Sequence, residues 1–118
     1  MSILLSVLAA AATLTSSFPP QLIGRWEVHP SNCKVDVELR DTDGWVVVKR
    51  NKLEFYEAEA QLLSLKTIAP ATYQASIKIS EDAEYFCETP RLKLATVDHL
   101  VFLSGALRGT YMRCKHAK

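Results

Sequence analysis

Histidines and carboxylates are the first side chains to consider for chemistry, because they carry most acid–base and metal sites. Asp98 directly precedes His99, which would suit half of a catalytic or metal-binding pair. Adjacent residues of a strand point to opposite faces, so we interpret this pair as a polar turn before Leu100. Cys114 and His116 have the spacing of paired ligands but lie at the C-terminus, where chains fray.

Other candidates for catalysis are equally isolated. Glu54, Glu57 and Glu59 could act as paired carboxylates, but no partner residues converge on them, and we interpret them as a solvated strand edge. Cys87 has no histidine near it in the sequence to activate a thiol nucleophile. The chain contains no G-x-S-x-G, G-x-x-x-x-G-K or C-x-x-C motif. We therefore expect no enzymatic activity, no metal site and no cofactor.

Length and charge narrow the class of protein. The 118 residues are enough for one domain. Lys and Arg total 14 against 13 Asp and Glu, and this balance argues against a nucleic-acid-binding protein. Lys49, Arg50 and Lys52 form a small basic cluster, which we interpret as soluble surface.

The N-terminus reads as a targeting segment. The apolar run from Ile3 to Leu14 is too short to span a bilayer, which takes roughly 20 residues, and small residues follow it. We predict a secretory signal peptide over residues 1–17, cleaved near Ser17 or at Ala12, and a mature domain over residues 18–118. A buried N-terminal helix is the alternative. The signal places the protein in the periplasm or outside a bacterial cell, with no stable membrane insertion of the mature chain.

The mature chain has the pattern of strands. Val35, Val37 and Leu39 alternate with charged residues, which predicts a strand over Lys34–Arg40. Asp41–Gly44 is a hairpin signal between this segment and Trp45–Val48.

Further short segments continue the pattern, with turns about every ten residues. Ala58–Leu65 could be helical, but its alternation continues to Thr67 and Pro70 ends it. The other expected strands are Leu53–Glu57, Tyr73–Ser80, Tyr85–Glu88, Leu92–Ala95, Leu100–Leu103 and Leu107–Cys114. Eight or nine short strands predict an all-β fold, a small antiparallel up-and-down β-barrel, with a β-sandwich as the alternative.

Three cysteines allow one disulfide and leave one free thiol. A closed barrel brings its first and last strands together, so of the three pairings we favour Cys33–Cys114. That bond closes a loop of about 80 residues and is worth roughly 4 kcal/mol on the chain-entropy model. Cys87 is then free, and inert if it is buried.

The triplet Gly24-Arg25-Trp26 at the first strand resembles the opening of the lipocalin-like, or calycin, barrels. The resemblance implies that Trp26 packs across the barrel floor under a basic residue of the last strand, either Arg113 or Arg108. The alternative is that Trp26 is a core aromatic without this special role.

Leu22–Trp26 followed by Cys33–Val37 resembles the bacterial alkaline-metalloproteinase inhibitor family. The resemblance implies a secreted eight-stranded barrel whose N-terminal trunk, here Phe18–Leu22, enters the cleft of a protease. The chain differs from that family in having no cysteine between residues 34 and 86.

Two kinds of partner follow from these patterns. A barrel can hold a small apolar or amphipathic molecule in its interior, or the protein can bind a protein partner as a protease inhibitor. The first requires space, and four aromatic residues expected to point inward would reduce it: Trp26, Trp45, Phe55 and Phe102.

Overall fold

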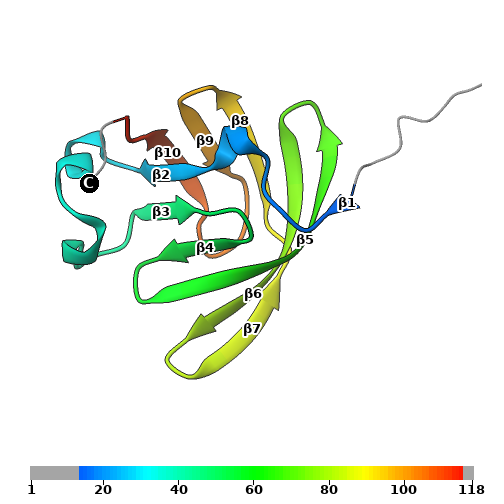
Figure 1. Cartoon of the computed structure of the whole chain (residues 1–118), viewed down its shortest axis with the longest axis horizontal. Helices are drawn as coiled ribbons and strands as arrows, with labels where there is room; N and C mark the ends of the chain where they lie inside the picture. Colours follow the sequence, from blue (N-terminus) through cyan, green and yellow to red (C-terminus); the bar gives the residue numbers. More distant parts are fainter. Residues whose placement is uncertain (1–13, 116–118) are drawn as a thin grey trace, which may run out of the picture.

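The computed structural model describes residues 14–115, in which the strands form a closed antiparallel barrel (Figure 1). The barrel strands are β2 (Gly24–Glu27), β3 (Trp45–Val48), β4 (Lys52–Phe55), β5 (Ala58–Ala69), β6 (Thr72–Glu81), β8 (Arg91–Thr96), β9 (His99–Phe102) and β10 (Gly109–Arg113). Each strand pairs with the next along this series, and β10 pairs back with β2. The expected up-and-down barrel is thereby confirmed over the sandwich alternative.

Two further strands extend the sheet beyond the barrel. β1 (Leu14–Thr15) pairs with the distal part of β5, at Leu65 and Lys66. β7 (Glu84–Glu88) pairs with the second half of β6, whose first half pairs with β8. Because β7 lies outside the barrel, the side chain of its Cys87 is exposed, and burial therefore does not shield this thiol.

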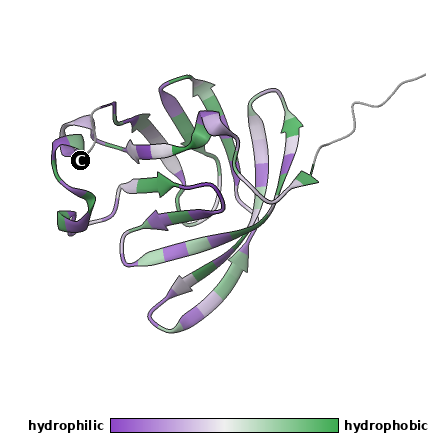
Figure 2. Ribbon diagram, in the orientation of Figure 1, coloured by the Kyte–Doolittle hydropathy of each residue, from purple (hydrophilic) through white to green (hydrophobic). Residues whose placement is uncertain are grey.

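The core lies inside the barrel and follows the alternation of the strands. Ala75, Ile77 and Ile79 of β6 are fully buried, and Figure 2 shows hydrophobic and hydrophilic residues alternating along the strands. Trp26 and Phe102 are also fully buried in this cluster, as expected for inward residues. The other two aromatic residues that we expected to point inward are not members of this buried cluster. Phe55 is half-buried at the cluster's margin, and Trp45 is buried but does not belong to the cluster.

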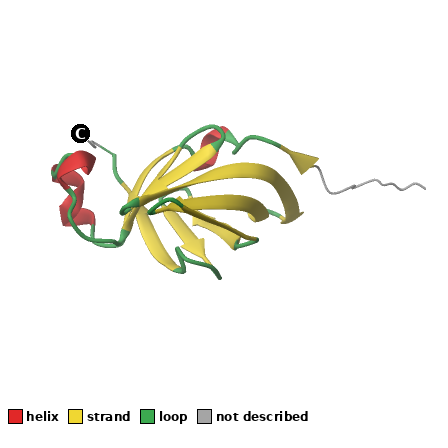
Figure 3. Cartoon of the chain, turned by 90° about the horizontal axis from the view of Figure 1, so that it is seen from below, coloured by secondary structure: helices red, strands yellow, loops and turns green. Residues whose placement is uncertain are grey.

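The expected strand over Lys34–Arg40 is wrong. This segment contains the last residue of one 3-10 helix, η3 (Pro30–Lys34), and the whole of a second, η4 (Val37–Leu39), which Figure 3 shows together at one end of the barrel. A strand needs a free edge, and β2 already pairs with β3 on one side and β10 on the other. Leu39 is accordingly 71% exposed, so the alternation of valines and charges here does not reflect a buried face.

Residues 18–22 close one end of the barrel. The 3-10 helix η2 (Pro20–Leu22) precedes β2, and both Leu22 and the preceding Phe18 belong to the core. The Phe18 amide donates to the carbonyl of Arg50 in the β3–β4 turn, at 2.7 Å. The trunk is therefore folded against the barrel rather than extended into solvent.

Most of the predicted signal peptide lies outside the described residues, which begin at Leu14. Within residues 14–115, no helix has the length and apolar character that a membrane crossing requires.

Candidate functional site

The closed end of the barrel brings together Gly24, Trp26 and Arg113. The guanidinium carbon of Arg113 lies 4.3 Å from the centroid of the Trp26 ring, a cation–π contact. The indole Nε1 donates to the Leu22 carbonyl at 3.0 Å, so its polar atom is satisfied at full burial. Gly24 has a φ of +137°, a conformation that side-chain-bearing residues rarely adopt, and the Arg113 guanidinium lies against it.

Arg113 also joins the trunk to the last strand. Its guanidinium donates to the carbonyls of Gln21 at 2.6 Å, Ile23 at 3.1 Å and Val97 at 3.1 Å. Arg108, the other candidate for covering Trp26, precedes β10 at its opposite end and does not reach the indole. The role of this end is structural, because core side chains and the trunk fill it.

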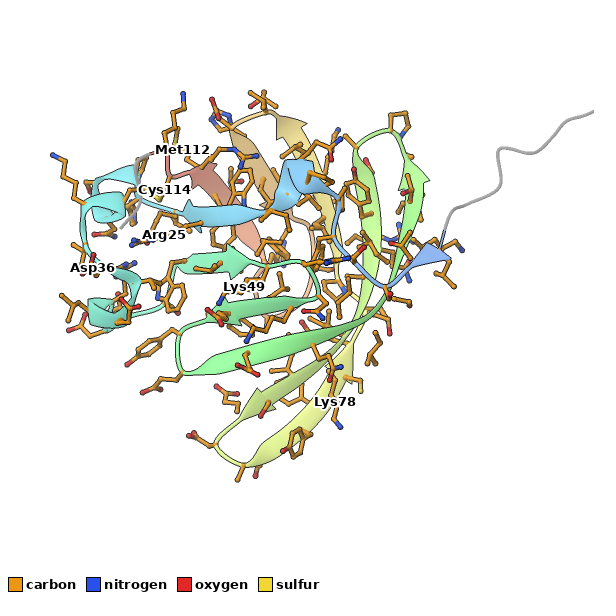
Figure 4. The ribbon with its side chains drawn as sticks, in the orientation of Figure 1. Arg25, Asp36, Lys49, Lys78, Met112 and Cys114 are labelled. Carbon is orange, nitrogen blue, oxygen red and sulfur yellow. A yellow bond between two sulfur atoms is a disulfide. The ribbon has the colours of Figure 1, made fainter. Side chains whose placement is uncertain are left out.

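A disulfide holds the long β2–β3 connection against the barrel. Cys33 and Cys114 are bonded, as expected, and the two residues are 81 positions apart in the chain. Figure 4 shows Cys114 and Arg25 close together, beside the connection that carries Asp36. The Cys114 amide donates to the Arg25 carbonyl at 2.8 Å, which continues the β10–β2 ladder past the last strand residue.

A buried ionic triad fixes the same connection at a second place. Glu27 is fully buried and accepts from Arg25 at 2.6 Å and from Arg40 at 3.0 Å. Arg40 also donates to the Thr42 hydroxyl at 3.1 Å, and Arg25 to the Asn32 carbonyl at 2.9 Å. Two positive charges around one carboxylate are tolerated here because every partner is hydrogen-bonded. The triad therefore fixes the position of residues 28–44, the connection between β2 and β3, which we call the wall.

The open end of the barrel carries a cavity of about 490 Å³, which we call the mouth. It lies between the β2–β3 connection, the β4–β5 turn and the β9–β10 loop. Its apolar and aromatic lining comes from Trp45, Phe55, Tyr56, Leu107 and Tyr111. Its polar lining comes from His29, Asn32, Arg40, Thr42, Asp43 and Arg108. A cavity of this size with mixed lining is suited to one small molecule.

Two tyrosines that line the mouth have raised pKa values. Burial, with a contribution from the Asp43 charge, raises the pKa of Tyr111 to about 12. The Tyr111 hydroxyl donates to the Leu107 carbonyl at 2.8 Å. The charge of Glu57 is the largest of several causes that raise the pKa of Tyr56 above its usual value. Both phenols therefore stay protonated to a higher pH than a tyrosine in water does.

The residues that suggested chemistry in the sequence do not converge. Asp98 lies 3.2 Å from Lys115 and 3.7 Å from Arg113, whereas His99 contacts the Thr96 hydroxyl at 2.7 Å. Cys114 is in the disulfide and is no metal ligand, and His116 lies outside the described residues.

The glutamates belong to a surface network on β4 and β5. Glu54 lies 3.1 Å from Lys49 and 3.3 Å from Lys52. Burial alone would raise the pKa of Glu54, but these two lysines outweigh it and hold the pKa below its usual value. Glu59 lies 4.0 Å from Lys52, and among residues 14–115 no group of three or more acidic, histidine or cysteine side chains could hold a metal ion.

The sequence predicts Trp45 and Phe55 as inward residues, and both line the mouth, but it does not indicate the polar part of the lining. Asp43 lies in the expected turn Asp41–Gly44, and Tyr111 lies in the expected strand Leu107–Cys114. The signal that could have found the site is a set of aromatic and charged residues at the turns of one barrel end, which requires knowing which turns share that end.

No family model, no curated protein and no solved structure matches this chain.

Proposed function

We propose that this protein is a secreted or periplasmic, non-enzymatic binding barrel that holds one small amphipathic molecule in its mouth. The observation that carries the proposal is the cavity of about 490 Å³, which is lined by both aromatic and charged side chains. The opposite end is packed with Phe18, Leu22 and Trp26, so it offers a ligand no comparable space.

The fold supports this use of the mouth. The disulfide and the Arg25–Glu27–Arg40 triad anchor the β2–β3 connection at two points, so the wall is held in place before a ligand arrives. A preorganised wall reduces the entropy lost on binding.

Export is part of the proposal. A disulfide between Cys33 and Cys114 is typical of proteins from oxidising compartments. Phe18 is the first buried residue of the described chain, directly after the predicted cleavage near Ser17. Cleavage there would leave the core intact, and the intact mass of exported protein should correspond to residues 18–118.

The alternative function is protease inhibition through the trunk. That mode needs Phe18–Leu22 to be free to enter a protease, whereas Phe18 and Leu22 are 3% and 0% exposed. The mouth is thus the better supported site.

Native mass spectrometry of the exported protein tests the mouth directly. We expect a non-covalent adduct that disappears on denaturation. Ala106→Trp should abolish it because Ala106 lines the mouth, and Ala95→Trp, on exposed β8 surface, should retain it. An apo species in all samples would contradict the proposal, and inhibition of a metalloprotease by that apo protein would support the alternative.

A further inference from the structure

Two charged side chains of the mouth have no partner among residues 14–115. Asp43 comes from the β2–β3 connection and Arg108 from the β9–β10 loop, and both line the mouth. Neither the Asp43 carboxylate nor the Arg108 guanidinium makes a hydrogen bond or ion pair with a described residue. Arg40 also lines the mouth, but it has partners, because its guanidinium donates to Glu27 and to the Thr42 hydroxyl. The fold therefore leaves one anion and one cation of the mouth available.

Both charges line the mouth together with Tyr111 and Leu107. The Asp43 carboxylate is close enough to the Tyr111 hydroxyl for its charge to oppose ionisation of that phenol. The same hydroxyl donates to the carbonyl of Leu107, the residue before Arg108. Asp43 and Arg108 thus line the same mouth as Tyr111 and Leu107, whose hydrogen bond forms part of its lining.

A ligand that satisfies both charges carries an ammonium and a carboxylate, with an apolar body between them. A single amino acid holds these groups on one carbon, whereas Asp43 and Arg108 come from two different loops. Two residues of extended chain separate the terminal charges by about 7 Å, at about 3.5 Å per residue. Resting on the proposed binding function, we infer that the mouth takes a short apolar peptide with free termini, its ammonium at Asp43 and its carboxylate at Arg108.

Isothermal titration calorimetry with four matched probes tests this inference by measuring the affinity of each. The probes are the dipeptide leucyl-phenylalanine, its N-acetyl form, its C-terminal amide and the form blocked at both ends. We expect the free dipeptide to bind most tightly and each blocked terminus to weaken binding about fivefold, the effect of one solvent-screened charge pair of about 1 kcal/mol. The doubly blocked form should be weakest.

Two variants assign the charges. Asp43→Asn should remove the preference for the free ammonium and keep the preference for the free carboxylate. Arg108→Gln should do the reverse. Glu84→Gln on β7 and Lys93→Gln on β8 are matched exposed controls away from the mouth and should bind all four probes as the wild type does.

The possible failures are distinguishable. Equal affinity for all four probes would overturn the inference and leave the proposed binding function standing. The same holds if no probe binds while the exported protein carries a different adduct sensitive to Ala106→Trp. Absence of both probe binding and adduct would overturn the inference together with the proposed function.

Discussion

Glu27→Gln is the substitution that most directly tests how the mouth wall is held. The carboxylate is fully buried between two arginines whose side chains are 5% and 7% exposed. Glutamine keeps the size of the side chain but removes the charge, so Arg25 and Arg40 lose the carboxylate that they share. Breaking a buried ion pair in this way costs about 3–5 kcal/mol. We expect the lower end, about 3 kcal/mol, because the triad lies outside the hydrophobic core cluster.

Urea denaturation followed by circular dichroism measures this loss as a fall in the unfolding free energy. A domain of this size is stable by about 5–15 kcal/mol, so the variant should still fold at low temperature. Glu59→Gln is the matched control, since Glu59 is 58% exposed and its lysine partner is 4.0 Å away. We expect that control to change stability by less than about 0.5 kcal/mol.

A second variant separates the charge from the packing. Replacing all three members of the triad with apolar residues of similar volume should recover most of the stability, because no uncompensated charge remains. If Glu27→Gln costs less than about 1 kcal/mol, the triad does not hold the connection, and the argument for a preorganised wall is refuted.

Three further predictions concern the core, the disulfide and the phenol. Because the pKa of Tyr111 rises from 10 to about 12 on folding, the unfolded state loses its proton first, and stability should fall by about 2–3 kcal/mol as the pH rises through this window. Urea midpoints against pH should show this loss reduced in Tyr111→Phe, and an unchanged profile would contradict it. Phe18→Ala should lower the free energy of unfolding by about 3 kcal/mol, because Phe18 is in the core. Deleting residues 1–17 should lower it by less than about 1 kcal/mol, since Leu14 is 68% exposed. Thermal melts compare the two variants, and equal losses would argue against a folded trunk. Replacing Cys33 and Cys114 together with serine should lower the free energy of unfolding, measured with denaturant, by about 4 kcal/mol. Cys87→Ser should leave it nearly unchanged, because Cys87 is exposed and unbonded among the described residues. A loss of similar size in both variants would rule out the assigned pairing.

The alternation of apolar and polar residues predicted the strands correctly where one face of the strand is buried. Ala75, Ile77 and Ile79 alternate with polar residues in β6, and all three are in the core. The number of such strands is compatible with a barrel or a sandwich. The pairing of β10 with β2 closes the barrel and brings Cys114 to Cys33.

The same pattern failed where no strand edge was free. Val35, Val37 and Leu39 alternate as regularly as β6 does, yet they lie in or beside 3-10 helices. Their alternation carries no information about pairing, and pairing is decided by β3 and β10 on either side of β2. Cys87 shows the complementary case: its strand forms, but on an extension of the sheet that no second layer covers.

The sequence by itself determined the all-β class and the strands with one buried face, because these depend on local periodicity, and it favoured one of three disulfide pairings. The tertiary structure alone decided where the β2–β3 connection runs and which residues meet in the mouth. Asp43 and Arg108 are 65 positions apart, and only barrel closure and the staggering of its turns bring both to one cavity.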